Sequence, residues 1–508
     1  MSNFAFLPLL TVLPLVGALV VALLPRDNDK LAKQVALGWS LVVLAVTLVM
    51  AGRYKADGDR FQFVSSYEWI PRFGIRFDFG VDGIALVMLV LIAILMPVVV
   101  LASWHDAVGG KRTVGTFFAL MLALESCMIG VFAATDVFLF YVFFEVMLVP
   151  MYFLIASYGG SRRQYAAVKF FLYSLVGGLF MLAAVIGLYV VSSGEGVGTF
   201  SFEKLAALDI DETTQRWLFL GFFIAFAIKA PLFPFHTWLP DAGGQAPIGA
   251  AVLLVGVLDK VGTYGFLRYC LPLFPEASTF FAPVAIVLSV IGIIYGALLA
   301  MGQSDMKRLV AYTSVAHFGF IGLGVFAFTS QAGTGAVLYM VNHGLSTGAL
   351  FLVVGFLVAR RGSSAVADFG GAGKVIPWIS GAFLIVGLSS LSLPGTNAFV
   401  SEFLVLLGSF TRLPVAAVIA AVGMILAALY ILLMYQRTMH GQLNPDLPKM
   451  KDLSRREAFV IAPMLILIIA LGFYPKPVID VINPAVQATL SDVGKTDPAP
   501  TANSGGGK

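Results

Sequence analysis

Nine ionisable side chains lie inside long apolar stretches of this chain. A charged group at membrane depth costs about 2.5–3.5 kcal/mol on insertion scales, so it needs a compensating partner or a use. A single such residue is as well explained by a structural ion pair or by a side chain that reaches the membrane surface. Acids, lysines and histidines that alternate along consecutive stretches are instead typical of a proton relay. The nine residues are Glu125, Glu145, Lys169, Lys229, Asp259, Lys260, His317, His343 and Glu402.

A relay needs groups that both hold and release a proton. Burial disfavours the charged form of acids and bases alike, and pairing restores it, so a change of partner can move a proton. Imidazoles titrate near neutral pH, which suits His317 and His343 to such a role, although a hydrogen-bonded core histidine is the alternative for each. Lys169 lies near the end of its segment, so a structural ion pair or a side chain that reaches the membrane surface is sufficient to explain it.

The stretch 229–268 holds two of these lysines around a helix break. An apolar helix runs into Lys229 and is followed at once by Pro231 and Pro234. A membrane protein tolerates such a break only where protein or a water-filled cavity satisfies the freed backbone groups. A second apolar helix then carries Lys260 near its middle. A charged, broken helix is typical of an ion pathway.

The composition that surrounds these residues is that of a polytopic membrane protein. The 508 residues are 59% hydrophobic and only 12% charged, against about 25% charged residues in soluble domains. The net charge of +4 is spread over loops and gives no support to nucleic-acid binding. Cys127 and Cys270 are not placed like metal ligands, so we expect no metal site.

Apolar runs of about 20 residues predict about 14 spanning helices, so the expected fold class is an all-α polytopic membrane protein. The polar and aromatic segment 52–80 is predicted to be a short extramembrane hairpin. The predicted spans are approximately 4–24, 31–51, 82–104, 114–133, 136–157, 164–192, 216–235, 246–269, 280–300, 306–328, 333–359, 376–408, 415–436 and 457–474.

Two breaks of the same kind suggest an internal symmetry. The seventh span breaks after Lys229 and the twelfth breaks at Leu393–Asn397, five spans later. Five-helix units in series have opposite orientations, so we predict two inverted repeats with one broken helix each. The predicted domains are 1–110, helices 1–3 with an extramembrane loop; 111–270, repeat 1 with helices 4–8; 271–440, repeat 2 with helices 9–13; 441–475, helix 14; and 476–508, a disordered tail.

The loops predict the orientation. Those after odd-numbered helices hold roughly 17 Lys and Arg residues and the others roughly 12. The odd-numbered loops, which include Lys307–Arg308 and Arg360–Arg361, are therefore expected in the cytoplasm, with both termini outside.

Three motifs resemble the antiporter-like membrane subunits of respiratory complex I, the proton-translocating NADH-quinone oxidoreductase. The broken-helix motif is KAPLFPFHTWLPDAGGQAP at 229–247. LPGTNAFVSEFL at Leu393–Leu404 and DVFLFYVFFEVMLVPMYFLI at Asp136–Ile155 are similar to the twelfth and fifth helices of the M-type members, the counterparts of mitochondrial subunit 4. The resemblance covers about Phe118 to Arg437.

The resemblance implies a membrane-arm subunit that translocates protons while other subunits oxidise NADH and reduce quinone. It implies no cofactor on this chain, whereas NADH, FMN, Fe-S clusters and quinone are implied for partner subunits. The implied partners are neighbouring complex I membrane subunits and, through them, the peripheral redox arm, in a bacterial inner (plasma) membrane. The implied roles are Glu145, fifth-helix carboxylate; Lys229, its lysine partner; Lys260, central lysine; His317 and His343, connecting histidines; Glu402, terminal exit group; and Glu125, secondary carboxylate of the fourth helix.

Two positions depart from the family pattern. Gly243 stands where the family usually has a histidine, and Asp259 stands where it usually has an apolar residue. Adjacent helical residues point about 100° apart, so Asp259 is not required to neutralise Lys260. The alternative function is a subunit of a multi-subunit cation/proton antiporter or membrane-bound hydrogenase, against which Glu402 argues because those relatives tend to carry lysine there. A purely structural subunit is disfavoured by the intact set of buried charges.

Overall fold

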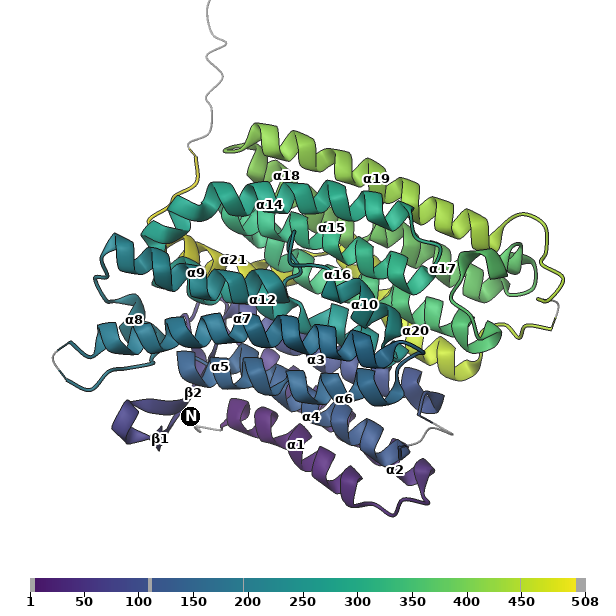
Figure 1. Ribbon diagram of the computed structural model, residues 1–508, viewed down its shortest axis with the longest axis horizontal. Coiled ribbons are helices and arrows are strands. Elements are labelled where there is room, and N and C mark those ends of the chain that lie inside the picture. Colours follow the sequence, from purple (N-terminus) through teal and green to yellow (C-terminus); the bar gives the residue numbers. More distant parts are fainter. Residues whose placement is uncertain (1–4, 108–111, 195, 448, 499–508) are drawn as a thin grey trace, which may run out of the picture.

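The computed structural model describes residues 5–107, 112–194, 196–447 and 449–498. Long helices lie side by side with a common direction (Figure 1). Within the described residues, 12 helices are long and apolar enough to cross a membrane, or up to 13 if a bent pair counts as one span. The all-α polytopic membrane fold is therefore confirmed. The two further predicted spans, 216–235 and 376–408, are those with breaks.

The outer helices present apolar side chains to the bilayer. Leu19 and Leu23 at one edge and Val415 and Ile425 at the other are among the most exposed residues. Apolar side chains face lipid without penalty, whereas water would not tolerate so large a patch. The outer helices are α1 (Phe6–Leu23), α2 (Asp29–Ala51), α5 (Val137–Val146), α6 (Leu148–Tyr158), α7 (Arg163–Ser192), α14 (Pro275–Met301), α19 (Pro414–Met439) and α20 (Arg455–Phe473).

The inner helices bury nearly all of their side chains. The run 249–273 is completely buried, and it contains two π-helical turns, Leu254–Leu258 and Phe266–Cys270. Such turns occur frequently at functional sites. The inner helices are α3 (Gly83–Ala102), α4 (Val114–Ala133), α11 (Ile248–Leu253), α12 (Lys260–Gly265), α13 (Leu271–Leu273), α15 (Met306–Phe326) and α16 (Ser330–Arg361).

Both predicted helix breaks are confirmed. Helix α9 (Glu212–Lys229) ends at the lysine, and α10 (Trp238–Gln245) follows after the proline-containing turn. Helices α17 (Pro377–Ser390) and α18 (Asn397–Phe410) are separated by the second break. Neither α9 nor α18 alone is long and apolar enough to cross a membrane. Helix α9 contains Glu212, Arg216 and Lys229, and α18 has only 14 residues. The inverted repeats and the domain boundaries stay predictions.

One end of the helices carries small extramembrane elements. The predicted hairpin is confirmed as antiparallel strands β1 (Gln62–Ile70) and β2 (Ile75–Val81), and the short helix α8 (Phe202–Ala206) lies at the same end (Figure 1). The first and the last described residues also lie at this end.

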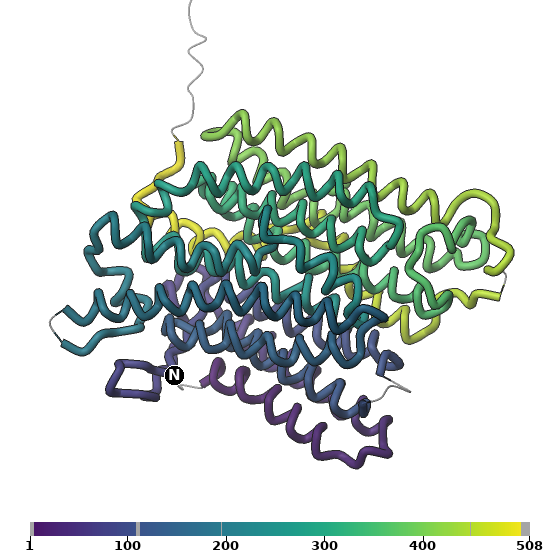
Figure 2. The backbone as a smooth tube through the Cα atoms, in the orientation of Figure 1, coloured from purple at the N-terminus to yellow at the C-terminus, as the bar shows by residue number. Residues whose placement is uncertain are grey.

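The prediction of a disordered tail over 476–508 is wrong for its first half. Helix α21 (Lys476–Asp492) occupies this segment and packs against α3 and α16. It is ordered because Ile482, Val486 and Leu490 recur on one face and are buried. In Figure 2 its yellow trace runs back among the middle helices instead of leaving the molecule. Residues 499–508 lie outside the described part.

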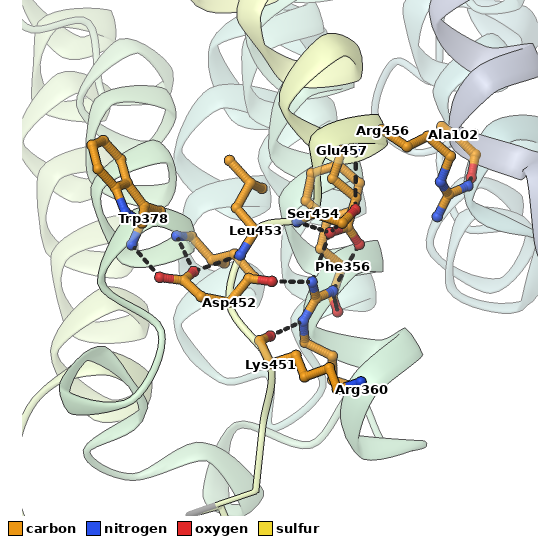
Figure 3. A network of polar contacts seen from close by, with 11 residues as sticks. Ala102, Phe356, Arg360, Trp378, Lys451, Asp452, Leu453, Ser454, Arg456 and Glu457 are labelled. Carbon is orange, nitrogen blue, oxygen red and sulfur yellow. Dashed lines mark hydrogen bonds and ion pairs between the residues drawn. The ribbon is translucent and has the colours of Figure 1, made fainter.

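A polar network fastens the start of α20 at the other end of the bundle (Figure 3). Arg360, at the end of α16, donates to both carboxylate oxygens of Glu457 at 2.8 and 2.6 Å. Asp452 accepts from the backbone N–H groups of Trp378 and Ile379, at the start of α17. Bidentate arginine–carboxylate pairs are the most specific in geometry, so this network fixes α16, α17 and α20 relative to one another.

Candidate functional site

Lys229 is the last residue of α9 and is buried, at 1% exposure. Its Nζ lies 4.7 Å from the ring centroid of Phe144 and 5.9 Å from that of Phe170. No hydrogen-bond partner for this Nζ exists among the described residues. Trp238 closes the broken end by donating its indole N–H to the carbonyl of Ile228 at 2.8 Å. The lysine charge therefore faces aromatic rings, which attract cations, beside a helix end with free carbonyl groups.

Glu145 lies on α5, two residues before Met147, where α5 gives way to α6. Its Oε1 is buried and has no hydrogen-bond partner among the described residues, so the predicted pair with Lys229 is not hydrogen bonded in this structure. The two groups nevertheless interact electrostatically. Glu145 Oε1 occupies the space in which a Cβ on Gly178 of α7 would stand. The absence of a side chain at Gly178 leaves room for the carboxylate.

Lys260 is completely buried at the start of α12 and has three polar contacts. Its Nζ lies 3.0 Å from Asp259 Oδ1 and 2.6 Å from His343 Nδ1, and it also donates to the carbonyl oxygen of Val255. The sequence did not require Asp259 to neutralise Lys260, and the structure shows that the two side chains are in contact, since the long lysine side chain reaches the carboxylate. A π-helical turn, Leu254–Leu258, comes just before this pair.

The histidines continue from Lys260 towards Glu402. The rings of His343 on α16 and His317 on α15 meet edge to face, with centroids 5.3 Å apart. The His317 ring lies 5.7 Å from that of Tyr339, and the Tyr339 hydroxyl donates to Glu402 Oε2 at 3.2 Å. Five side chains from α12, α16, α15 and α18 thus form a contiguous path through the buried centre. Hydrogen bonds lie at its two ends, and ring contacts join the middle, where neither His317 nitrogen has a hydrogen-bond partner among the described residues.

Tyr339 and Ser392 were not identified from the sequence. Tyr339 lies four residues before His343, on the same helical face, and that spacing could have revealed it. Ser392 donates to Glu402 Oε2 from the break between α17 and α18, where its φ of 62° is unusual for a residue other than glycine. No local sequence signal marks that contact.

A neutral hydrogen-bond network holds the second break against α16. Asn342 donates to the carbonyl oxygen of Asn397 at 2.7 Å. Ser346 and Ser389 donate to Asn397 Oδ1 at 3.0 and 2.7 Å. Asn397 begins α18, so this network fixes the helix that carries Glu402.

Three further ionisable residues, two of them buried, lie outside the path. Neither carboxylate oxygen of Glu125 has a hydrogen-bond partner among the described residues, so the structure does not join this residue to the others. Lys169 pairs with Asp241 at 2.7 Å, which supports its structural interpretation. Arg268, which was not among the nine candidates, is buried and pairs with Asp82 at 2.6 Å.

The site contains ionisable groups but no arrangement for a metal ion. No group of three or more His, Cys, Asp or Glu side chains in the described part of the chain could hold one, and both cysteines are free and buried. The chemistry that the side chains themselves can perform is proton transfer between nitrogen and oxygen atoms.

Comparisons with known proteins agree with this geometry. A family model described as NADH:quinone oxidoreductase/Mrp antiporter matches residues 134–429. NADH-quinone oxidoreductase subunit M of Mycobacterium tuberculosis is 48% identical, over 99% of this chain and 97% of its own length. Among solved structures, a chain of respiratory complex I from Thermus thermophilus has a TM-score of 0.87 at 31% identity, covering 96% of this chain and 100% of its own.

The Mrp complex of Dietzia sp. DQ12-45-1b contains a chain with a TM-score of 0.83 at 21% identity, covering 96% of this chain and 100% of its own. At that identity the likeness concerns the fold alone. The family model spans more than half of the sequence, and a subunit M relative matches almost all of it. The chain therefore belongs to the NADH-quinone oxidoreductase subunit M family of antiporter-like membrane proteins.

Proposed function

We propose that this chain conducts protons across a bacterial inner membrane as the M-type subunit of an NADH-quinone oxidoreductase. NADH, FMN, Fe-S clusters and quinone act on partner subunits, and this chain couples to them through neighbouring membrane subunits and the peripheral arm. The observation that carries the proposal is the contiguous path from Lys260 through His343, His317 and Tyr339 to Glu402.

The second half of the path moves a proton by exchange between neighbours. Lys260 donates to His343 Nδ1, and the imidazole pair passes a proton to the hydroxyl oxygen of Tyr339. Tyr339 already donates to Glu402, so it accepts one proton as it releases another and remains neutral. Glu402 then carries the proton towards the exit.

The first half of the path depends on Glu145 and Lys229. In one state the Glu145 carboxylate approaches the Lys229 ammonium and stabilises the protonated form of the lysine. In the other state, which resembles the separation seen here, Lys229 has aromatic neighbours and no hydrogen-bond acceptor. Loss of a charged partner in a buried site favours the neutral form of the lysine, and the proton passes towards Lys260. Glu125 is a secondary carboxylate beside this half.

The orientation follows the distribution of basic residues. The loops after odd-numbered spans face the cytoplasm, and both termini lie outside. The two inverted repeats, 111–270 and 271–440, then contribute one half of the path each, with one broken helix in each half.

The test is Glu402→Gln in the assembled enzyme. Glutamine keeps the shape and the contacts with Tyr339 and Ser392 but cannot be protonated at neutral pH. We expect a lower ratio of protons pumped to NADH oxidised, measured in inverted membrane vesicles, with normal amounts of assembled complex. A wild-type ratio in this variant would contradict the exit role. The antiporter alternative predicts instead cation transport by the chain without copurifying Fe-S and flavin subunits.

A further inference from the structure

Asp259 is a buried carboxylate that the path described above does not use. Its Oδ1 contacts Lys260 Nζ at 3.0 Å, and its Oδ2 has no hydrogen-bond partner among the described residues. The whole side chain is buried, at 0% exposure. A buried polar atom without a partner costs about 1–3 kcal/mol, and more when it is charged. Such a group in a native structure calls for an explanation, and a catalytic role is one.

The position of Asp259, beside Lys260 and near the end of α9, supplies that explanation. Helices α9 and α12 pack backbone against backbone here, because a Cβ on Gly262 would lie 2.5 Å from the backbone nitrogen of Ala230. This close approach brings the end of α9, with its lysine, beside the start of α12. Asp259, the residue before α12, contacts Lys260 directly and lies near the end of α9 that carries Lys229.

We propose that Asp259 is the proton carrier between Lys229 and Lys260, and thus the link between the two halves of the path. The inference rests on the proposed proton-conducting function. Lys229 Nζ has no hydrogen-bond partner among the described residues, so it does not bond to Lys260 directly. Asp259 already contacts Lys260, and its carboxylate can accept a proton that the neighbouring lysine releases.

The transfer proceeds in balanced steps. Lys260 first gives a proton to His343 Nδ1 and becomes a neutral amine. Lys229, once Glu145 has moved away, gives a proton to Asp259 Oδ2, so an ammonium and a carboxylate become a neutral amine and a carboxylic acid. The Asp259 carboxyl group then turns about its Cβ–Cγ bond and gives this proton to the Lys260 amine, which restores the ion pair seen here. Glu145 and a new proton restore Lys229.

The alternative role of Asp259 is a static ion pair that holds Lys260 in position. Asp259→Asn separates the two roles, because the amide keeps a hydrogen-bond acceptor for Lys260 but cannot carry the proton. Asp259→Glu keeps the carrier. The matched control is Asp446→Asn, which removes an acid that is exposed and paired with Arg361 on the surface.

The variants are compared in assembled complex by the ratio of protons pumped to NADH oxidised. We expect Asp259→Asn to lower this ratio as far as Glu402→Gln does, the double variant to lower it no further, and Asp259→Glu to restore at least half of the loss. Asp446→Asn should match wild type. If Asp259→Asn pumps normally while Glu402→Gln does not, the carrier role is wrong and the proposed function stands. If both pump normally, the proposed function is wrong as well.

A spectroscopic measurement covers the case in which Asp259→Asn does not assemble. Reaction-induced infrared difference spectra of wild type and Asp259→Glu are compared in the carbonyl region of protonated carboxylic acids. A carrier becomes protonated during turnover, so a band should shift between the two proteins. A static ion pair remains ionised, and identical spectra in this region would overturn the proposal.

Discussion

Replacement of Lys229 by arginine tests whether this residue only carries a positive charge or also has to give up its proton. The lysine ammonium lies over the ring of Phe144 at 4.7 Å and near that of Phe170. A guanidinium can occupy the same aromatic surroundings, since arginine stacks on aromatic faces at least as well as lysine. Lys229→Arg therefore keeps the positive charge at the end of α9 and changes mainly the ease of deprotonation.

The magnitude follows from the reference acidities. The reference pKa of arginine lies above that of lysine, so arginine is harder to deprotonate by roughly 2–3 pH units. At about 1.4 kcal/mol per unit, this difference adds about 3–4 kcal/mol to any step in which the residue gives up its proton. Such an increase slows the step about 100- to 1000-fold. The burial of the site applies to both side chains and does not remove this difference.

The assay is the ratio of protons pumped to NADH oxidised in assembled complex. We expect Lys229→Arg to lower this ratio to that of Glu402→Gln, despite the retained charge. The matched control is Lys169→Arg, because Lys169 forms an ion pair with Asp241 at 2.7 Å that arginine can also form. Full pumping by assembled Lys229→Arg would show that this residue keeps its proton throughout, and the switch between Glu145 and Lys229 would then be wrong.

Two further predictions test the surroundings of the path and its orientation. Gly178→Ala places a methyl group where Glu145 Oε1 now lies, and we expect the flexible carboxylate to move and pumping to fall about as far as in Glu145→Ala. Normal pumping together with an unmoved carboxylate in the variant's structure would contradict this. Ser363→Cys, in the loop after α16, should react with a membrane-impermeant thiol reagent only from the cytoplasmic side, since Cys127 and Cys270 are buried and do not interfere. Labelling from outside intact cells would reverse the topology.

The sequence was sufficient to predict features that depend on local chemistry. The break after Lys229 follows from proline, which cannot continue a helix, and the hairpin in 52–80 follows from a polar, aromatic segment between apolar runs. The acids, lysines and histidines were recognisable because so few charges occur in apolar stretches. These predictions required only the residue and its neighbours along the chain.

Features that depend on spacing in three dimensions were not predictable. The contact between Asp259 and Lys260 depends on the rotamers of two adjacent side chains, which the helical spacing does not determine. The bond from Ser392 to Glu402 joins a loop to the helix after it. Helix α21 was mistaken for disorder because its composition is polar overall, whereas its order comes from one buried face.

The charged residues of the path coincide with irregularities in the helices. Lys229 ends α9, Glu145 lies beside the junction of α5 and α6, and Lys260 follows a π-helical turn. A regular helix uses its own backbone groups and has none left for a buried charge, whereas a break leaves carbonyl and N–H groups free. The contact between Lys260 and the carbonyl oxygen of Val255 is an instance.

The remaining candidates fit the same principle. His317 and His343 lie within the uninterrupted helices α15 and α16, and a neutral imidazole needs far less compensation than an ion. Glu125 also lies within an uninterrupted helix, α4, but it is a carboxylic acid with no hydrogen-bond partner among the described residues. By this reasoning Glu125 stays protonated and outside the path, and Glu125→Gln should reduce pumping less than any of the substitutions at Glu145, Lys229, Asp259 or Glu402.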